Sequence, residues 1–89
     1  SARKFNQDIS NWDVSNVTNM EGMFMSTEEF NQDISNWDVS NVTNMTEMFD
    51  SSEKFNQDLS MWEVHSLKEF NQFSFEASSY KLPKPKFKN

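Results

Sequence analysis

Acidic side chains recur at one fixed spacing along the 89-residue sequence. Asp13, Asp38 and Glu63 stand 25 positions apart, so a fold that repeats with this period places them in one column. Neighbouring parallel strands lie about 4.8 Å apart, and like charges at that separation repel unless they are screened or bound. The column is interpreted in three ways: an acidic strip that recognises a basic protein surface, a weak Ca²⁺ site, or a solvated face that serves solubility. A flat column supplies too few of the roughly six oxygens that Ca²⁺ requires, so we assign no metal site.

His65 is the only histidine, and the sequence has no cysteine. Its register matches that of Ser15 and Ser40, which predicts a position on the outward face. A serine, a histidine and an aspartate can be selected from so polar a chain by chance, yet nothing in the sequence positions a nucleophile or an oxyanion site. Every catalytic residue type lies in a repeated column. We therefore expect no enzymatic activity, no catalytic residues and no cofactor.

These columns exist because a 25-residue unit is written nearly three times. The string FNQDISNWDVSNVTNM begins at Phe5 and again at Phe30, and a looser copy, FNQDLSMWEVHSLKEF, begins at Phe55. The first two units share 20 of 25 positions, and the second and third share 7 of 25. Such a period predicts a solenoid in which each coil packs only on its neighbours. The expected segments are 1–4 (the end of a preceding segment or an expression scar), 5–80 for the solenoid, with coils 5–29, 30–54 and 55–79, and 81–89 for a basic tail.

Two hydrophobic periods occur within each unit. Residues 11–15 alternate between polar and apolar, which is the spacing of a strand. Residues 20–24 place apolar side chains at i, i+3 and i+4, which is the spacing of a helix. Thr18, with Glu21 three residues later, fits a helix capping box. We therefore predict an α/β solenoid of right-handed coils, with short parallel β-strands on one side and short helical segments on the other.

The outward side of the expected strands is the candidate binding surface. The residues that would point outward are Asn11, Asp13, Ser15, Asn36, Asp38, Ser40, Met61, Glu63 and His65. We predict that this face contacts protein. Trp12, Trp37 and Trp62 share the inward phase with valines, so we interpret them as core and not as a stacking surface for sugars or bases.

A second set of polar columns opens each unit. Its members are Asn6, Gln7, Asp8, Asn31, Gln32, Asp33, Asn56, Gln57 and Asp58. An aspartate in a turn can accept hydrogen bonds from backbone amides, and stacked coils need partners for the amides of their turns. We interpret this set, together with Asn16 and Asn41, as structural.

The net charge of −6 is unevenly distributed. Residues 5–80 hold 14 acidic side chains but only two lysines. Because this negative charge repels phosphate groups, we expect no nucleic-acid partner. The tail is basic and holds two prolines, which favours an extended path. We expect Leu82 and Phe87 of the tail, or another chain, to cover the open end of the third coil. No run of about 18 apolar residues is present, so we expect no transmembrane segment here.

The pattern Ile9-x-x-Trp12-x-Val14-x-x-Val17 has the spacing of a leucine-rich-repeat core, with other apolar residues in place of the leucines. Together with the repeated string and the Met-Phe pair that follows it, this pattern resembles the BspA-like leucine-rich repeat surface proteins, in particular the 25-residue DUF285-type repeats common in mycoplasma lipoproteins. The resemblance covers about 5–80 and is closest in the first two units. It implies leucine-rich-repeat-like coils, a bacterial cell-surface or secreted location, and adhesion to host matrix or to other cells for some relatives. It implies no catalytic motif.

Together these observations predict a non-enzymatic module that contacts a protein through the outward strand face. The partner would be host matrix or another surface protein. The alternative is a purely structural spacer with no ligand of its own. Residues 1–4 are too few to shield the first coil, so we also expect self-association through exposed end coils.

Overall fold

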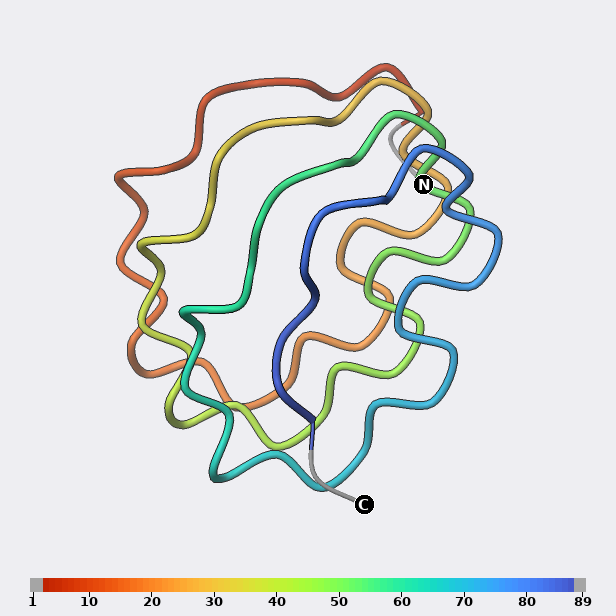
Figure 1. Ribbon diagram of the computed structural model, residues 1–89. Coiled ribbons are helices and arrows are strands. Elements are labelled where there is room, and N and C mark those ends of the chain that lie inside the picture. The colour runs from red at the N-terminus through yellow and green to blue at the C-terminus, as the bar shows by residue number, and fades with distance from the viewer. Residues whose placement is uncertain (1–2, 88–89) are drawn as a thin grey trace.

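The chain winds three times around one core, and each turn of the winding corresponds to one 25-residue unit (Figure 1). The structure is a computed structural model that describes residues 3–87. We name the three turns coil 1 (5–29), coil 2 (30–54) and coil 3 (55–79). Parallel bridges join Asn19 to Asn44 and Asn44 to Glu69, so residues 25 apart lie side by side. The principal extents of 30 × 28 × 22 Å make the stack a compact globule.

The prediction of an α/β solenoid, with strands on one side and helical segments on the other, is wrong. Residues 3–87 contain no helix and no extended strand, and their parallel pairing is limited to the two isolated bridges. The period places residues side by side as expected. The local backbone is a succession of tight turns, because many amides donate to carbonyls of the next coil and not to carbonyls of the same segment.

The segments expected to be helical form consecutive turns. In coil 1, the amides of Met23, Met25 and Thr27 donate to the carbonyls three residues earlier, at 3.2, 3.1 and 3.2 Å. Gly22 and Ser26 occupy the third position of their turns with φ of 62° and 60°. Such left-handed residues interrupt a right-handed helix. The same conformation recurs in the later coils at Glu47, Ser51, Gln72 and Glu76.

The amides that a helix would have used bond the next coil instead. We call 20–26, 45–51 and 70–76 the ladder segments. In the first two, every second amide donates to the carbonyl 24 residues later, in the segment that follows. From coil 1 to coil 2 the donors are Met20, Gly22, Phe24 and Ser26, at 2.8 to 2.9 Å. From coil 2 to coil 3 they are Met45, Glu47, Phe49 and Ser51, at 2.7 to 2.9 Å.

The segments expected to be strands are turns as well. The amide of Trp12 donates to Ile9 at 3.0 Å and that of Val17 donates to Val14 at 3.0 Å. Both bonds recur in coils 2 and 3. The capping box expected at Thr18 is also absent, because the side chain of Asn19 accepts the Glu21 amide at 2.9 Å. The carbonyl of Thr18 bonds coil 2 instead.

Aromatic side chains fill the core in two columns that run through the stack. Phe5, Phe30 and Phe55 stack with ring centroids 5.7 and 5.8 Å apart, and Tyr80 continues the column edge-on at 5.2 Å. A second column begins with Phe24, which lies 4.3 Å from Phe30. Large aromatic surfaces of this kind supply much of the burial that offsets the ordering of the chain.

The tryptophans tie neighbouring coils together. Trp37 and Trp62 are buried, and their indole N–H groups donate to the carbonyls of Ile9 and Ile34 at 3.2 and 3.0 Å. Trp12 is 52% exposed, because no coil among the described residues lies before it. The interpretation of this column as core is therefore confirmed for two tryptophans and wrong for Trp12.

The tail covers coil 3 with one of the two side chains expected to do so. Phe87 stacks on Phe70 at 4.4 Å and meets Phe73 edge-on at 4.9 Å. The carbonyl of Pro83 accepts the Leu59 amide at 2.9 Å. Leu82 remains 42% exposed, so its expected role is not seen.

The tryptophan column allows a matched test of inter-coil hydrogen bonding. Trp37→Phe keeps an aromatic ring but removes the donor to Ile9, and we expect the free energy of unfolding to fall by about 1 kcal/mol. Trp12→Phe, in the same register but exposed, should change it by less than about 0.5 kcal/mol. Urea denaturation followed by fluorescence of the remaining tryptophans measures both. Equal losses would contradict the role given to the indole N–H.

Candidate functional site

The structure places the predicted binding residues on one outer side of the stack. We call this set the acidic face; its members are Asn11, Asp13, Ser15, Asn36, Asp38, Ser40, Met61, Glu63 and His65. Seven of the nine are exposed, and the two serines are partly buried. The negative charge of Asp13 acts on Asp38, so these carboxylates are near neighbours as the period predicts. The face is built of turns and not of strands.

Each aspartate of this face is held by its own turn. Oδ1 of Asp13 accepts hydrogen bonds from the hydroxyl of Ser15 at 2.6 Å and from its amide at 3.1 Å. Asp38 and Ser40 repeat both bonds at the same lengths. An aspartate that bonds the residue two positions later forms an Asx turn. The carboxylates are therefore fixed in direction before any partner arrives.

These bonds also keep the carboxylates charged. The hydroxyl of Ser15 and then its amide hold the pKa of Asp13 below 3.8. The pKa of Asp38 is also lowered, because the bonds from Ser40 outweigh the opposing effect of the nearby Asp13 charge. The stacked negative charges thus persist, although proximity alone would favour neutralising one of them.

Coil 3 departs from this arrangement. Glu63 takes the aspartate position and His65 the serine position, and no hydrogen bond joins these two side chains. Met61 replaces an asparagine and is 78% exposed. Coils 1 and 2 therefore contribute identical, hydrogen-bonded residues to the acidic face, and coil 3 contributes chemically different ones.

A second column of aspartates repeats the same turn. Asp8, Asp33 and Asp58 accept the amide of the serine two residues later at 3.0, 2.9 and 2.9 Å. Hydrogen bonds from that serine hold the pKa of each below 3.8. The structural role expected for these aspartates is confirmed.

The asparagine and glutamine columns also serve the stack. Oδ1 of Asn6 accepts the Asn31 amide at 3.0 Å, and Oδ1 of Asn31 accepts the Asn56 amide at 2.8 Å. The side-chain amides of Gln32 and Gln57 bond the same asparagines, at 3.0 Å to Oδ1. Outside these columns, Asn41 donates from its side chain to the Ser15 carbonyl at 2.8 Å. The structural interpretation is confirmed for these residues, whereas no such bond is seen for Gln7 or Asn16, which are exposed.

One feature at the outer side of coil 1 was missed by sequence reasoning. A hollow of about 330 Å³ is lined by Phe5, Trp12, Gly22, Met23, Phe24, Met25 and Thr27. Met23 and Met25 are 36% and 38% exposed, although the helix spacing placed Met23 in the core. The available signal was Met25 itself, an apolar residue where coil 2 has Asp50.

Three features are absent from the described residues. Between residues 3 and 87, no group of three or more histidine, aspartate or glutamate side chains is placed to hold a metal ion. No helix there has the length and apolar character needed to cross a membrane. Nor does that part of the chain bury a side-chain nitrogen or oxygen without a hydrogen-bond partner.

The geometry defines a repeat protein in which side chains contact the equivalent residues of the next coil, as Asn6 does with the Asn31 amide and Phe5 with Phe30. The chain belongs to the family described as "Mycoplasma protein of unknown function, DUF285", whose model matches residues 1–87. Comparisons with curated proteins and with solved structures found no match.

The Asx turns predict an acid-sensitive contribution to stability. Because the folded pKa of Asp13 lies below 3.8, its contribution is present above about pH 4 and is lost as the pH falls through the folded pKa. Ser15→Ala removes the hydroxyl donor and should raise the pKa of Asp13 toward 3.8. Carboxyl-carbon NMR titration measures this shift. Asp58, held by Ser60 in another coil, serves as the internal control and should not move.

Proposed function

We propose that this protein is a non-enzymatic binding module whose acidic face contacts a basic protein surface. The observation that carries the proposal is the pair of Asx turns that hold Asp13 and Asp38 exposed, oriented and ionised at neighbouring steps of the stack. A rigid array of charges loses little conformational freedom on binding and favours rapid association with an oppositely charged partner.

The same arrangement supports binding over catalysis. Acid–base catalysis needs groups whose pKa lies near the working pH, whereas hydrogen bonds keep the pKa of Asp13 and Asp38 low. His65 lies exposed on coil 3. We therefore propose that the module turns over no substrate.

The location and the class of partner rest on resemblance. The likeness of the repeated string to BspA-like surface proteins supports a cell-surface or secreted bacterial protein that binds host matrix or another surface protein. Membership of the DUF285 family agrees with a bacterial source. Many weak contacts along a regular face would add to a useful overall affinity.

A structural spacer is the second candidate, and one observation favours it. Asp13 and Asp38 already satisfy amides and hydroxyls of their own turns. These bonds explain why the residues are aspartates without any ligand. A spacer would bind nothing through this face and would tolerate changes to it.

Two matched triple variants distinguish these functions. Asp13→Asn, Asp38→Asn and Glu63→Gln remove three charges from the acidic face, whereas Asp8→Asn, Asp33→Asn and Asp58→Asn remove three from the structural column. Immobilised extracellular-matrix proteins are the probes, and surface plasmon resonance is the measurement. We expect the first variant to bind at least about tenfold more weakly, because it loses the charges of the acidic face that attract and orient a basic partner. The second should retain most of the binding.

Each other outcome has a definite meaning. Unchanged binding by the first variant would exclude the acidic face as the contact surface. Equal loss in both variants would show a response to net charge alone. Absence of binding by the wild-type protein to every probe would favour the spacer.

A further inference from the structure

Met61 is the one apolar side chain of the acidic face. It is 78% exposed, and the equivalent residues of coils 1 and 2 are Asn11 and Asn36. Asn36 is exposed although a coil lies on each side of it, so this repeat position points to solvent whichever coils flank it (Figure 1). The exposure of Met61 therefore follows from its position in the repeat and not from its place in coil 3.

The core of the stack makes no use of Met61. The cluster of buried and partly buried apolar side chains in residues 3–87 does not include it, whereas the adjacent Trp62 belongs to that cluster. Methionine is flexible and polarisable, so it adapts to apolar groups of different shape and is enriched at protein interfaces. A single exposed apolar residue is common on protein surfaces. Met61 differs from such residues because it shares a face with the oriented carboxylates of Asp13 and Asp38.

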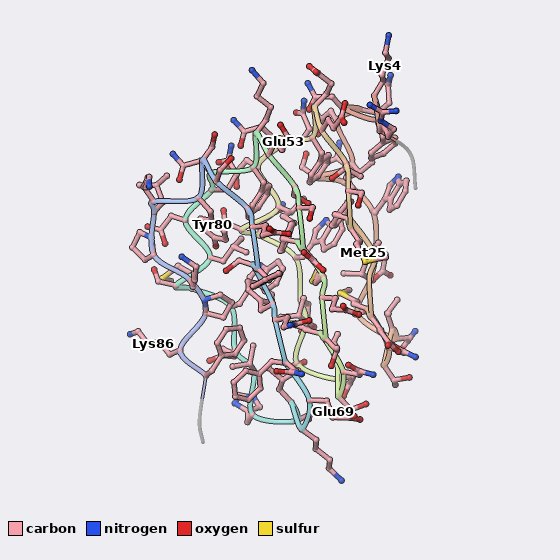
Figure 2. The ribbon with its side chains drawn as sticks, turned by 90° about the vertical axis from the view of Figure 1, so that its right-hand side faces the viewer. Lys4, Met25, Glu53, Glu69, Tyr80 and Lys86 are labelled. Carbon is pink, nitrogen blue, oxygen red and sulfur yellow. The ribbon has the colours of Figure 1, made fainter. Side chains whose placement is uncertain are left out.

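The carboxylates of the acidic face have no cation of their own among the described residues. Within residues 3–87, the one ion pair joins Arg3 to Glu28 at 2.9 Å. Lys4 and Lys86 lie at opposite ends of the stack (Figure 2). The acidic face can therefore attract cationic side chains of another protein.

The spacing of these groups suits an extended segment. Asp13, Asp38 and Met61 lie on successive coils, and Met61 stands two positions before the residue that continues the aspartate column. The rings of Phe30 and Phe55, equivalent residues of coils 2 and 3, have centroids 5.8 Å apart. Alternate side chains of an extended chain are about 6.7 Å apart. An extended segment that crosses the coils can therefore set alternate side chains against Asp13, Asp38 and Met61.

We propose that the acidic face binds an extended protein segment with basic side chains at two alternate positions and an apolar side chain at the next alternate position, and that Met61 selects the apolar side chain. This inference rests on the proposed function, since it names the partner of the same face. Asp13 and Asp38 accept the two cations, and the apolar side chain packs on Met61. Coils 1 and 2 have asparagine at this position, so coil 3 alone makes the apolar contact.

The chain has a segment of this composition in its own tail. Leu82, Lys84 and Lys86 are exposed and alternate with prolines. However, Lys84 lies over the ring of Tyr80, 4.3 Å from its centroid, and Pro85 is buried, so the tail is held against its own coil 3. Two copies, each with a net charge of −6, also repel each other. The occupant is therefore a segment of a different protein.

NMR titration with two peptides tests the role of Met61. The peptide LSKSKSL offers two lysines with a leucine on each side, so it can bind in either direction, and SSKSKSS has serines in place of the leucines. We expect the wild-type protein to bind the leucine peptide about fivefold more tightly, because a leucine side chain is removed from water against Met61. Met61→Asn, which restores the residue of coils 1 and 2, should abolish this preference and leave the affinity for the serine peptide unchanged.

Two control variants make the result specific. Met61→Leu keeps an apolar side chain on the acidic face and should keep the preference. Leu82→Asn removes an apolar side chain that is 42% exposed outside the acidic face, and it should keep the preference as well. Neither Met61 nor Leu82 belongs to the core cluster, so we expect all of these variants to unfold at the same urea concentration as the wild-type protein.

The outcomes separate this inference from the proposed function. Equal affinity of the wild-type protein for both peptides, or the same preference in Met61→Asn, would overturn the role of Met61 and leave the acidic face as a surface for basic proteins. Unchanged binding of the serine peptide by Asp13→Asn/Asp38→Asn, or no binding of either peptide at concentrations up to about 10 mM and low ionic strength, would overturn both. Sedimentation that rises with protein concentration in the wild type but not in Met61→Asn would assign the face to a second copy and overturn the proposed occupant.

Discussion

The hydrogen-bond ladder between coils is the interaction on which the rest of the structure depends. Every second amide of the first two ladder segments donates to the coil that follows, at 2.7 to 2.9 Å. Those amides are then unavailable for a helix, and the intervening residues close tight turns instead. Left-handed residues such as Gly22 and Glu47 direct successive amides toward the neighbouring coil. The backbone is thereby satisfied between turns of the winding, which gives a folded core without helices or extended strands.

The side chains extend the same rule. Asn6 bonds the amide of Asn31, and the ring of Phe5 stacks on Phe30. Each such residue contacts the equivalent residue 25 positions later, so the same contacts recur wherever the sequence repeats. Asn56 of coil 3 continues this asparagine column, because its side-chain oxygen accepts the amide of Lys81 in the tail. The tail thus starts in the register of a fourth coil and then leaves it to cover the core.

Several features could be predicted from sequence because they depend on register alone. The 25-residue period places Asp13 beside Asp38, and the asparagine column bonds from coil to coil. The local conformation could not be predicted in this way. Apolar spacing at 20–24 agrees with a helix, but it agrees equally with turns that bury Met20 and Phe24 and leave Met23 36% exposed. Hydrophobic periodicity reports which side chains are buried, not which carbonyl each amide reaches.

The sequence by itself determined the stacking period, the polar columns and the outward position of the carboxylates, because these follow from identical residues at a constant spacing. Only the tertiary structure decided that the units fold as turns, since backbone hydrogen bonding between coils competes with bonding inside them. It also decided that Trp12 is exposed while Trp37 is buried. These two tryptophans occupy the same repeat position but differ in burial, because burial depends on whether a neighbouring coil lies against them, which the sequence of one repeat cannot specify.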